Sequence, residues 1–310
     1  MKITPSSSYT HLTEPEALGI LSANYGIDGL INALPSERDQ NFKVSVSGTN
    51  QFVLKIGSPL ESDRFVIFQD EVLHFLTHHK LPFSVPSPVP GKDGKNILSF
   101  QTQTGEERLV RLVSYIEGET LSGVIHKDPK LLRSLGKSVA NLHQVLSEFD
   151  NEVPKRDAFP WDLTNAYEVI STNLDYTEES PKRHLLEKLC ETLRDDIQPK
   201  LHGLPCSLLH NDANDHNVLV GPAATDGRQV VGILDFGDMI YGPCIYDLAV
   251  SVAYAQMGTN DPLSSIMNLV QAYNEIQQLN QEELEVLFTL IRARLAVSVS
   301  LSAAHLHDGN

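Results

Sequence analysis

The chain has 310 residues, 41% of them hydrophobic and 21% charged, which is typical of a globular protein and long enough to favour two domains. Its formal net charge of -16 argues against nucleic acid and membrane surfaces as partners, because phosphate backbones and anionic lipids carry the same sign. The three cysteines are too widely spaced for a disulfide framework, the N-terminal segment shows no apolar run that could serve as a signal peptide, and no stretch without charges reaches the length of a membrane span. We therefore expect a cytoplasmic protein.

The N-terminal part, residues 1–116, has mainly strand patterns. Five segments have strand character: residues 29–34, 42–47, 51–56, 96–100 and 107–118. The turn Gly48-Thr49-Asn50 joins the second and third of them in a hairpin. A short helix is expected at 14–25, and apolar residues at helical spacing predict a longer helix within 58–80. These elements predict a small N-terminal lobe, built on an antiparallel sheet of about five strands with one inserted helix.

Helical patterns prevail in the remainder of the chain, residues 117–310. Helices are expected at residues 128–149, 162–170 and 180–201, and three more close the chain. Between the two helical groups, strand character returns at 218–220 and 229–236 around a Thr225-Asp226-Gly227 turn. Asn280 and Glu283 have capping-box spacing at the start of the last helix. We predict an α+β protein with a larger, mostly helical C-terminal lobe.

The octet HNDANDHN, residues 210–217, is a polar loop between two apolar segments. A second apolar run ends about 17 residues further on and is followed directly by Asp235, in the triplet Asp-Phe-Gly. Phosphoryl transfer needs such a set, because Mg²⁺ bound to phosphate oxygens prefers a few hard oxygen ligands. Asn217 and Asp235 supply such oxygens, which leaves Asp212 to orient an acceptor hydroxyl and take its proton. The spacing His-x-Asp-x₄-Asn followed by Asp-Phe-Gly is more specific than either half alone.

Two other interpretations of the octet remain open. One is a solvated turn rich in Asn and Asp. The other is a metal hydrolase whose ligands would be His210, Asp212, Asp215 and His216. The second interpretation lacks a further cluster at ligand spacing elsewhere in the chain.

Lys55 lies in the apolar strand segment 51–56, where a lysine needs an anionic partner or a phosphate. Glu71 on the following helix is a candidate for that partner. In another helix register, Gln69 or Asp70 would take the inward position. A lysine that points into solvent from an edge strand is the alternative.

Seven segments follow one another along the chain in this order: PSERDQNFKV, FVLKI, RLVSYIEGETL, WDL, HNDANDHNVLV, ILDFGDMIYGP and YDLAVSVAYA. With them the chain resembles the aminoglycoside phosphotransferase-like small-molecule kinase superfamily, which shares its two-lobed fold with protein kinases. Within it, the chain is most similar to the hydroxylysine kinase branch and to phosphotransferase domains fused to aminotransferases. The resemblance covers nearly the whole chain and predicts the two-lobed protein-kinase-like fold.

The resemblance also implies roles for individual residues. Asp212 would be the catalytic base, Asn217 and Asp235 would bind Mg²⁺, and Lys55 would hold the α- and β-phosphates of ATP or GTP. Residues 36–42, with Ser36 and Asn41, would form a turn over the nucleotide. Residues of the hinge would meet the purine with their backbone: Ser114, Tyr115 and Ile116. Two residues would brace the catalytic loop: His210 and Asp247. The segments WDL and GDMIY imply four substrate contacts, which are Trp161, Asp162, Asp238 and Tyr241, with the tryptophan stacking on an ammonium group.

Three departures from the family pattern bear on function. The turn SERDQNF has no glycine, and Asn211 stands where aminoglycoside enzymes usually have glycine, which disfavours antibiotic resistance. The family usually continues with a further helical segment, so we expect a shortened substrate lobe.

The resemblance predicts a kinase that transfers the γ-phosphate of ATP or GTP to a small cationic metabolite with a hydroxyl group, hydroxylysine first. Homoserine, choline, ethanolamine and aminoglycosides are alternative acceptors, and a functional association with an aminotransferase is expected. A protein kinase is disfavoured, because no Ala-Pro-Glu triplet follows Asp-Phe-Gly. A nucleotide-binding protein without catalysis is the alternative from a different class.

Overall fold

The computed structural model describes residues 11–36, 38–47, 51–102, 105–177, 179–223 and 227–307. The predicted turn Gly48-Thr49-Asn50, Glu37 of the nucleotide turn, and Thr225 and Asp226 lie outside these ranges. Spatial contacts divide the chain into an N-terminal unit, residues 1–80 with 84–117, and a C-terminal unit, residues 81–83 with 118–310. The domain boundary expected between residues 116 and 117 stays a prediction, because such a division does not show which parts fold independently.

The N-terminal unit contains a six-stranded antiparallel sheet in the order β1-β2-β3-β6-β4, with β5 also paired to β6. Its strands are β1 (Leu30–Leu34), β2 (Gln40–Ser45), β3 (Gln51–Ile56), β4 (Pro88–Val89), β5 (Ile97–Gln101) and β6 (Glu107–Ser114). Five of them match the predicted strand segments. The sixth, β4, lies in the proline-rich connector and is too short to give a periodic pattern.

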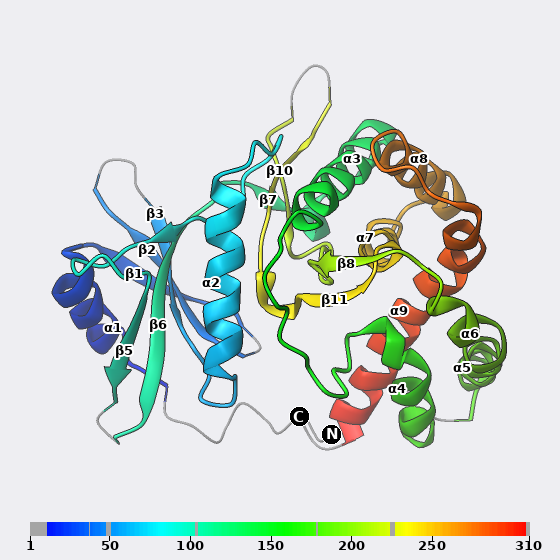
Figure 1. The fold of residues 1–310 in the computed structure, drawn as a ribbon, viewed down its shortest axis with the longest axis horizontal. Helices are drawn as coiled ribbons and strands as arrows, with labels where there is room; N and C mark the ends of the chain where they lie inside the picture. The colour runs from blue at the N-terminus through cyan, green and yellow to red at the C-terminus, as the bar shows by residue number, and fades with distance from the viewer. Residues whose placement is uncertain are drawn as a thin grey trace. The chain divides into compact units, whose positions relative to one another are not determined.

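Two helical segments flank this sheet (Figure 1). They are α1 (Glu14–Ile20), continued by the π-helical turn η1 (Leu21–Tyr25), and α2 (Asp63–Thr77). Alternation along the strands explains the arrangement, because Phe42 and Val44 of β2 pack with Leu54 of β3 in one buried cluster with α1. Asn41 and Lys55 alternate with these residues along the strands, so they face the side that α2 covers.

The C-terminal unit is mostly helical, as predicted, with two small antiparallel sheets. Its helices are α3 (Pro129–Leu146), α4 (Ala166–Asn173), α5 (Pro181–Thr192), α6 (Gln198–Leu201), α7 (Ile245–Ala255), α8 (Pro262–Asn274) and α9 (Gln281–His307). Its strands are β7 (Glu119–Thr120), β8 (Cys206–Leu209), β9 (Val218–Val220), β10 (Val230–Ile233) and β11 (Ile240–Pro243). One sheet has the order β10-β9-β7, and the other pairs β11 with β8. Short turns complete the unit: η2 (Leu121–Gly123), η3 (Leu163–Asn165), η4 (Leu174–Tyr176), η5 (Leu193–Ile197) and η6 (Phe236–Asp238).

Helices α3 and α8 lie side by side (Figure 1), and Gly136 permits their close approach. A Cβ atom at Gly136 would collide with the backbone carbonyl of Leu269 and lie 3.1 Å from the backbone nitrogen of Tyr273. Next to this crossing, the buried His143 on α3 shares a hydrogen bond of 2.7 Å with the hydroxyl of Tyr273.

The last helix, α9, begins with the predicted capping box. Glu283 donates its backbone N–H to the side chain of Asn280 (2.9 Å), and the Glu283 carboxylate accepts the Asn280 N–H (3.0 Å), which confirms the prediction. With 27 residues, α9 is long and apolar enough to cross a membrane, yet 56% of its most apolar window is buried within the protein. A buried core helix has these properties as well, so they are weak grounds for a membrane span.

Candidate active site

The octet 210–217 connects β8 to β9, and the segment with Asp235 connects β10 to β11. Antiparallel pairing of β9 with β10 places the ends of these connections together, since Val218 lies opposite Ile233. The Leu234 N–H then donates to the Asn217 carbonyl (2.8 Å). Asn217 and the residue directly before Asp235 are thus held together by the backbone.

Asp247, in the first turn of α7, fixes the start of the octet. Its buried carboxylate accepts backbone N–H groups from His210 (3.0 Å) and Asn211 (2.6 Å). The His210 ring is fully buried and accepts the Asp212 N–H (3.1 Å) at Nδ1, so it donates from Nε2 to the Leu234 carbonyl (2.9 Å). Burial lowers the pKa of His210 and so favours this neutral form. His210 therefore links the two loops.

Two non-glycine residues of the site adopt the left-handed backbone conformation, Asn211 with φ of 63° and Asp235 with φ of 58°. Asn and Asp tolerate this region better than other side chains. The Asn211 amide donates to the carbonyls of Trp161 (3.3 Å) and Asp238 (3.2 Å). The Asp235 carboxylate accepts the Gly237 N–H (3.1 Å) in the turn that follows.

Asp212 and Asn217 are in direct contact. The Asn217 side-chain amide donates from Nδ2 to the backbone carbonyl of Asp212 (3.0 Å) and to its Oδ2 (2.7 Å). Because both partners only accept hydrogen bonds, the amide nitrogen must point to them, and Oδ1 of Asn217 points elsewhere. The other carboxylate oxygen of Asp212, Oδ1, accepts the amide of Asn214 (2.9 Å).

Sequence reasoning missed Arg294 of α9, whose guanidinium forms an ion pair with Oδ1 of Asp212 (2.8 Å). It lies 82 residues further along the chain, so no local spacing links the two. The only sequence signal is an arginine within an apolar helical stretch. Burial and the neighbouring Asp238 carboxylate raise the pKa of Asp212 well above its ordinary value, whereas Arg294 acts in the opposite direction.

The four predicted substrate residues have different surroundings in the structure. The Trp161 carbonyl accepts a hydrogen bond from Asn211 of the octet, and the Arg294 guanidinium lies over one face of the Trp161 ring, 4.5 Å from the centroid. Asp162 caps η3 by accepting the Thr164 N–H (2.8 Å), and burial raises its pKa. Asp238 is buried, and Tyr241 on β11 is 63% exposed. Their contacts with a substrate stay predictions.

In the N-terminal unit, Lys55 lies on β3 between Asn41 of β2 and Arg111 of β6. Its ammonium pairs with the Asp39 carboxylate at 3.7 Å, and the buried Arg111 reaches the same carboxylate at 3.6 Å. Arg111 also donates to the side chain of Gln69 on α2.

Glu71, the candidate partner of Lys55, is exposed, and the inward position of α2 belongs to Gln69, which is 5% exposed, as in the alternative helix register. Two residues correspond to about 200° of helical rotation, so the two side chains point to opposite sides. The apolar stripe from Phe65 through Val72 to Leu76 sets this register.

The other predicted nucleotide contacts lie near the ends of β2 and β6. Ser36 is exposed before β2, and Asn41 is in β2. The Ser114 and Tyr115 N–H groups donate to the carbonyls of Ser87 (2.9 Å) and Gln51 (3.0 Å). Both N–H groups of these residues are therefore engaged within the unit, so a backbone donor for a purine would begin at Ile116.

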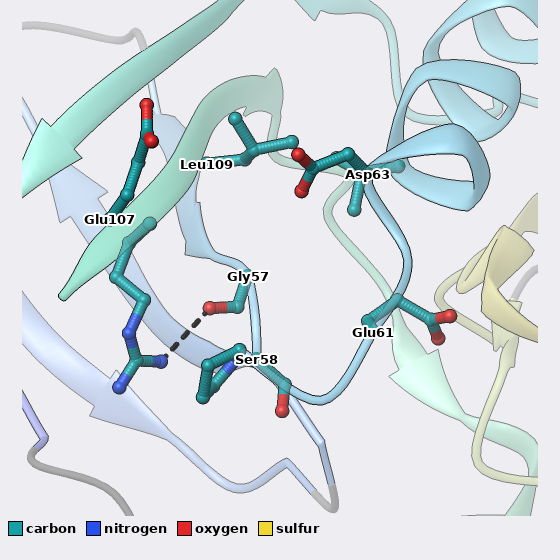
Figure 2. Close-up of a pocket in the computed structure, with 9 residues that line it drawn as sticks. Gly57, Ser58, Glu61, Asp63, Glu107 and Leu109 are labelled. Carbon is teal, nitrogen blue, oxygen red and sulfur yellow. Dashed lines mark hydrogen bonds between the residues drawn. The ribbon is translucent and has the colours of Figure 1, made fainter.

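A small pocket in the N-terminal unit is lined by none of the predicted nucleotide contacts (Figure 2). It has a volume of about 90 Å³ and is lined by acidic side chains, including Glu61, Asp63 and Glu107, beside Arg108. Arg108 donates to the Gly57 carbonyl (3.1 Å). The pocket is far below the several hundred Å³ of a cofactor site, so it does not hold a nucleotide.

The donor set of the two loops fits a magnesium ion. Oδ1 of Asn217 and the carboxylate of Asp235 are hard oxygens, and Mg²⁺ in kinase sites takes one or two such ligands besides water and phosphate oxygens. Within the described ranges, no group of three or more His, Cys, Asp or Glu is arranged to hold a metal. Together with the two engaged ring nitrogens of His210, this makes the metal-hydrolase interpretation wrong.

The antiparallel sheet, the helical C-terminal unit and the loops with Asp212 and Asp235 define a small-molecule kinase of protein-kinase-like fold. The sequence profile described as "Phosphotransferase enzyme family" matches residues 31–284. The chain belongs to this family, as the sequence predicted, and is a small-molecule phosphotransferase.

Individual proteins support this assignment. The chain is 29% identical over 312 residues to hydroxylysine kinase of Xenopus laevis, a match that covers 94% of this chain and 82% of that protein. Its fold is similar to an amicoumacin kinase in complex with AMP-PNP, Ca²⁺ and Ami, with a TM-score of 0.71, 16% identity, and coverage of 95% of this chain and 87% of that chain. A microcompartment-associated aminopropanol kinase has a TM-score of 0.70, 18% identity, and coverage of 94% of both chains.

Proposed function

We propose that this chain transfers the γ-phosphate of ATP or GTP to a hydroxyl of a small amino-bearing metabolite, with hydroxylysine as the first candidate. The observation that carries the proposal is the contact between Asp212 and Asn217. It leaves Oδ2 of Asp212 with one hydrogen bond from Asn217 and turns Oδ1 of Asn217 away from Asp212, so that this oxygen can serve as a ligand for a cation. The similarity to hydroxylysine kinases supports the choice of acceptor.

In the proposed reaction, the acceptor oxygen forms a bond to the γ-phosphorus, and the bond from that phosphorus to the β,γ-bridging oxygen breaks. The acceptor proton passes to Asp212, which contributes about 10²- to 10⁴-fold to the rate. Asn217 and Asp235 would hold Mg²⁺, which neutralises charge on the phosphoryl group when it is bound. Lys55 would contact the α- and β-phosphates, and Asp247 with His210 would keep the octet in place.

The net charge of -16 and the carboxylates of Asp238 and Asp235 near Asp212 support a cationic acceptor. Homoserine, choline, ethanolamine and aminoglycosides also combine a positively charged nitrogen with a hydroxyl, so they belong in the same test. We also propose a cytoplasmic location, which the free state of Cys190, Cys206 and Cys244 supports.

The test is release of nucleoside diphosphate by the purified protein with Mg²⁺, using ATP and GTP separately, against hydroxylysine, homoserine, choline, ethanolamine and kanamycin. We expect release that depends on one acceptor, together with a phosphorylated product of that acceptor. Asp212→Asn is the control and should lose turnover while it still binds nucleotide. Nucleotide binding without any product from this panel would contradict the proposal and favour a nucleotide-binding protein without catalysis.

A further inference from the structure

Arg294 is held on three sides inside the C-terminal unit. Its side chain is 2% exposed, and it donates to Oδ1 of Asp212 (2.8 Å), to the carbonyl of Trp161 (3.1 Å) and to the hydroxyl of Tyr254 (3.2 Å). The rings of Trp161 and Tyr254 lie 4.5 and 5.6 Å from the guanidinium carbon. These contacts fix the orientation of the guanidinium, because each of its three nitrogens donates to a different partner.

Packing alone does not explain an arginine at this place. Its neighbours on α9, Ile291, Ala293 and Val297, are buried and apolar, and an apolar side chain of similar length would fill the same space. Replacing a buried ion pair by apolar residues is often neutral or stabilising, because the charges lose their hydration. The contact with Asp212 therefore points to a role in function.

The hydrogen bonds around Asp212 distinguish its two oxygens. Oδ1 accepts from Arg294 (2.8 Å) and Asn214 (2.9 Å), which uses both of its lone pairs. Oδ2 accepts from Asn217 (2.7 Å) and keeps capacity for one more hydrogen bond. The oxygen that can receive a proton from an acceptor hydroxyl is thus Oδ2, and Arg294 fixes the rotation of the carboxylate that presents it.

We propose that Arg294 is a positioning residue for the phosphoryl acceptor. It fixes the orientation of the Asp212 carboxylate so that Oδ2 accepts a hydrogen bond from the hydroxyl of the substrate. This inference rests on the proposed function. It makes α9 part of the catalytic apparatus, in parallel with α7, which holds the same loop through Asp247. The two helices are joined at this point, since the Tyr254 hydroxyl that accepts from Arg294 also shares a hydrogen bond of 2.7 Å with Ser298.

The test compares Arg294→Met, Arg294→Lys and Arg294→Ala with the unmodified chain and with Arg292→Met. Arg292 is on the same helix, is only partly buried and has no contact with Asp212 in the described structure, so its variant controls for loss of an arginine. The measurements are kcat and KM for the acceptor, the Kd of the Mg²⁺-nucleotide complex, and the unfolding midpoint. Acceptor-dependent turnover of the unmodified chain is measured first, because its absence overturns the proposed function and not the positioning role.

We expect kcat of Arg294→Met to fall on the order of 10²-fold, as for other misplacements of a reacting group by about 1 Å, with nucleotide Kd unchanged within about 3-fold. Arg294→Lys keeps the positive charge but loses the planar set of N–H donors of the guanidinium. Its kcat should therefore lie between those of Arg294→Met and the unmodified chain. Millimolar guanidinium should restore part of the kcat of Arg294→Ala, while equal concentrations of ammonium should not.

A kcat of Arg294→Met within about 3-fold of the unmodified chain, the change expected of Arg292→Met, would overturn the proposal. So would parallel losses of kcat, nucleotide affinity and unfolding midpoint without rescue by guanidinium, since these identify a purely structural role. If Arg294→Met does not fold, Arg294→Lys decides: a loss of kcat at constant nucleotide Kd supports positioning, and an unchanged kcat rejects it.

Discussion

The amide of Asn217 spans the backbone carbonyl and the carboxylate of Asp212, with hydrogen bonds of 3.0 and 2.7 Å. One side chain therefore closes the octet on itself and at the same time orients its own oxygen away from Asp212. This position needs two N–H donors, one for the Asp212 carbonyl and one for its carboxylate. No other residue of similar size offers two N–H groups together with an acceptor oxygen.

Asn217→Asp should destabilise the protein and abolish turnover. The new carboxylate would face the Asp212 carboxylate and carbonyl without a donor, which costs about 1–3 kcal/mol in unfolding free energy. Urea unfolding at neutral pH and acceptor-dependent turnover measure both effects. The matched control is Asn268→Asp on α8, where the amide donates only to the Ser264 carbonyl at the surface (2.8 Å), and its unfolding free energy should change by less than about 0.5 kcal/mol.

Asp235→Asn should weaken the binding of nucleotide in the presence of Mg²⁺ by at least about 10-fold, since the amide is a poorer ligand than a carboxylate for a hard cation. Binding without Mg²⁺, in EDTA, should stay the same. Titration calorimetry at several Mg²⁺ concentrations separates the two effects. Equal affinity of Asp235→Asn and the unmodified chain in Mg²⁺ would refute the role of Asp235 as a metal ligand.

Asp247→Asn should loosen the octet, because one carboxylate oxygen that accepts a backbone N–H is replaced by an NH₂ group. The carboxylate is 1% exposed and accepts from His210 and Asn211, so the loss should be about 3 kcal/mol in unfolding free energy. Hydrogen exchange should show faster exchange of these two amide protons than in the unmodified chain. Unchanged protection of both amides would show that Asp247 does not hold the loop.

Gly136→Ala should destabilise the contact between α3 and α8 by at least about 2 kcal/mol, because the new methyl group would meet the Leu269 carbonyl and force the helices apart. Gly19→Ala on α1 is the control, since nothing lies within 4 Å of its Cβ position. That variant should gain about 0.5–1 kcal/mol from helix propensity. Chemical unfolding of both variants measures the difference, and equal stability would mean that the helices do not approach this closely.

His143 should make stability depend on pH. Burial lowers its pKa below the ordinary value of about 6.5, against the opposing effect of Asp247, so the unfolded chain binds the proton more readily. The contribution is complete above about pH 6.5 and is lost as the pH falls towards the folded-state pKa. The slope of unfolding free energy between pH 7 and 5 should be smaller in His143→Asn, which keeps a partner for the Tyr273 hydroxyl. Identical slopes would contradict the assignment.

Local sequence patterns determined most of the fold. Alternating residues in the segments 42–47 and 51–56 and the helical spacing within 58–80 predicted strands and a helix that the structure confirms. Asn280 and Glu283 predicted the start of α9, because a capping box is made by residues three apart. The octet and the Asp-Phe-Gly triplet likewise identified the family, since their chemistry depends on short spacings.

Only the tertiary structure decided which side chains meet. The sequence could not choose between Gln69 and Glu71, because the register of α2 on the sheet is set by packing along the whole helix. Nothing in the sequence indicated that the Arg294 guanidinium would lie over the Trp161 ring. Nor did anything in it indicate that Arg294 would pair with Asp212, which is 82 residues away along the chain. Periodicity and caps arise from neighbours within a few residues, whereas an ion pair between two loops or helices depends on how the chain folds back, which no local pattern specifies.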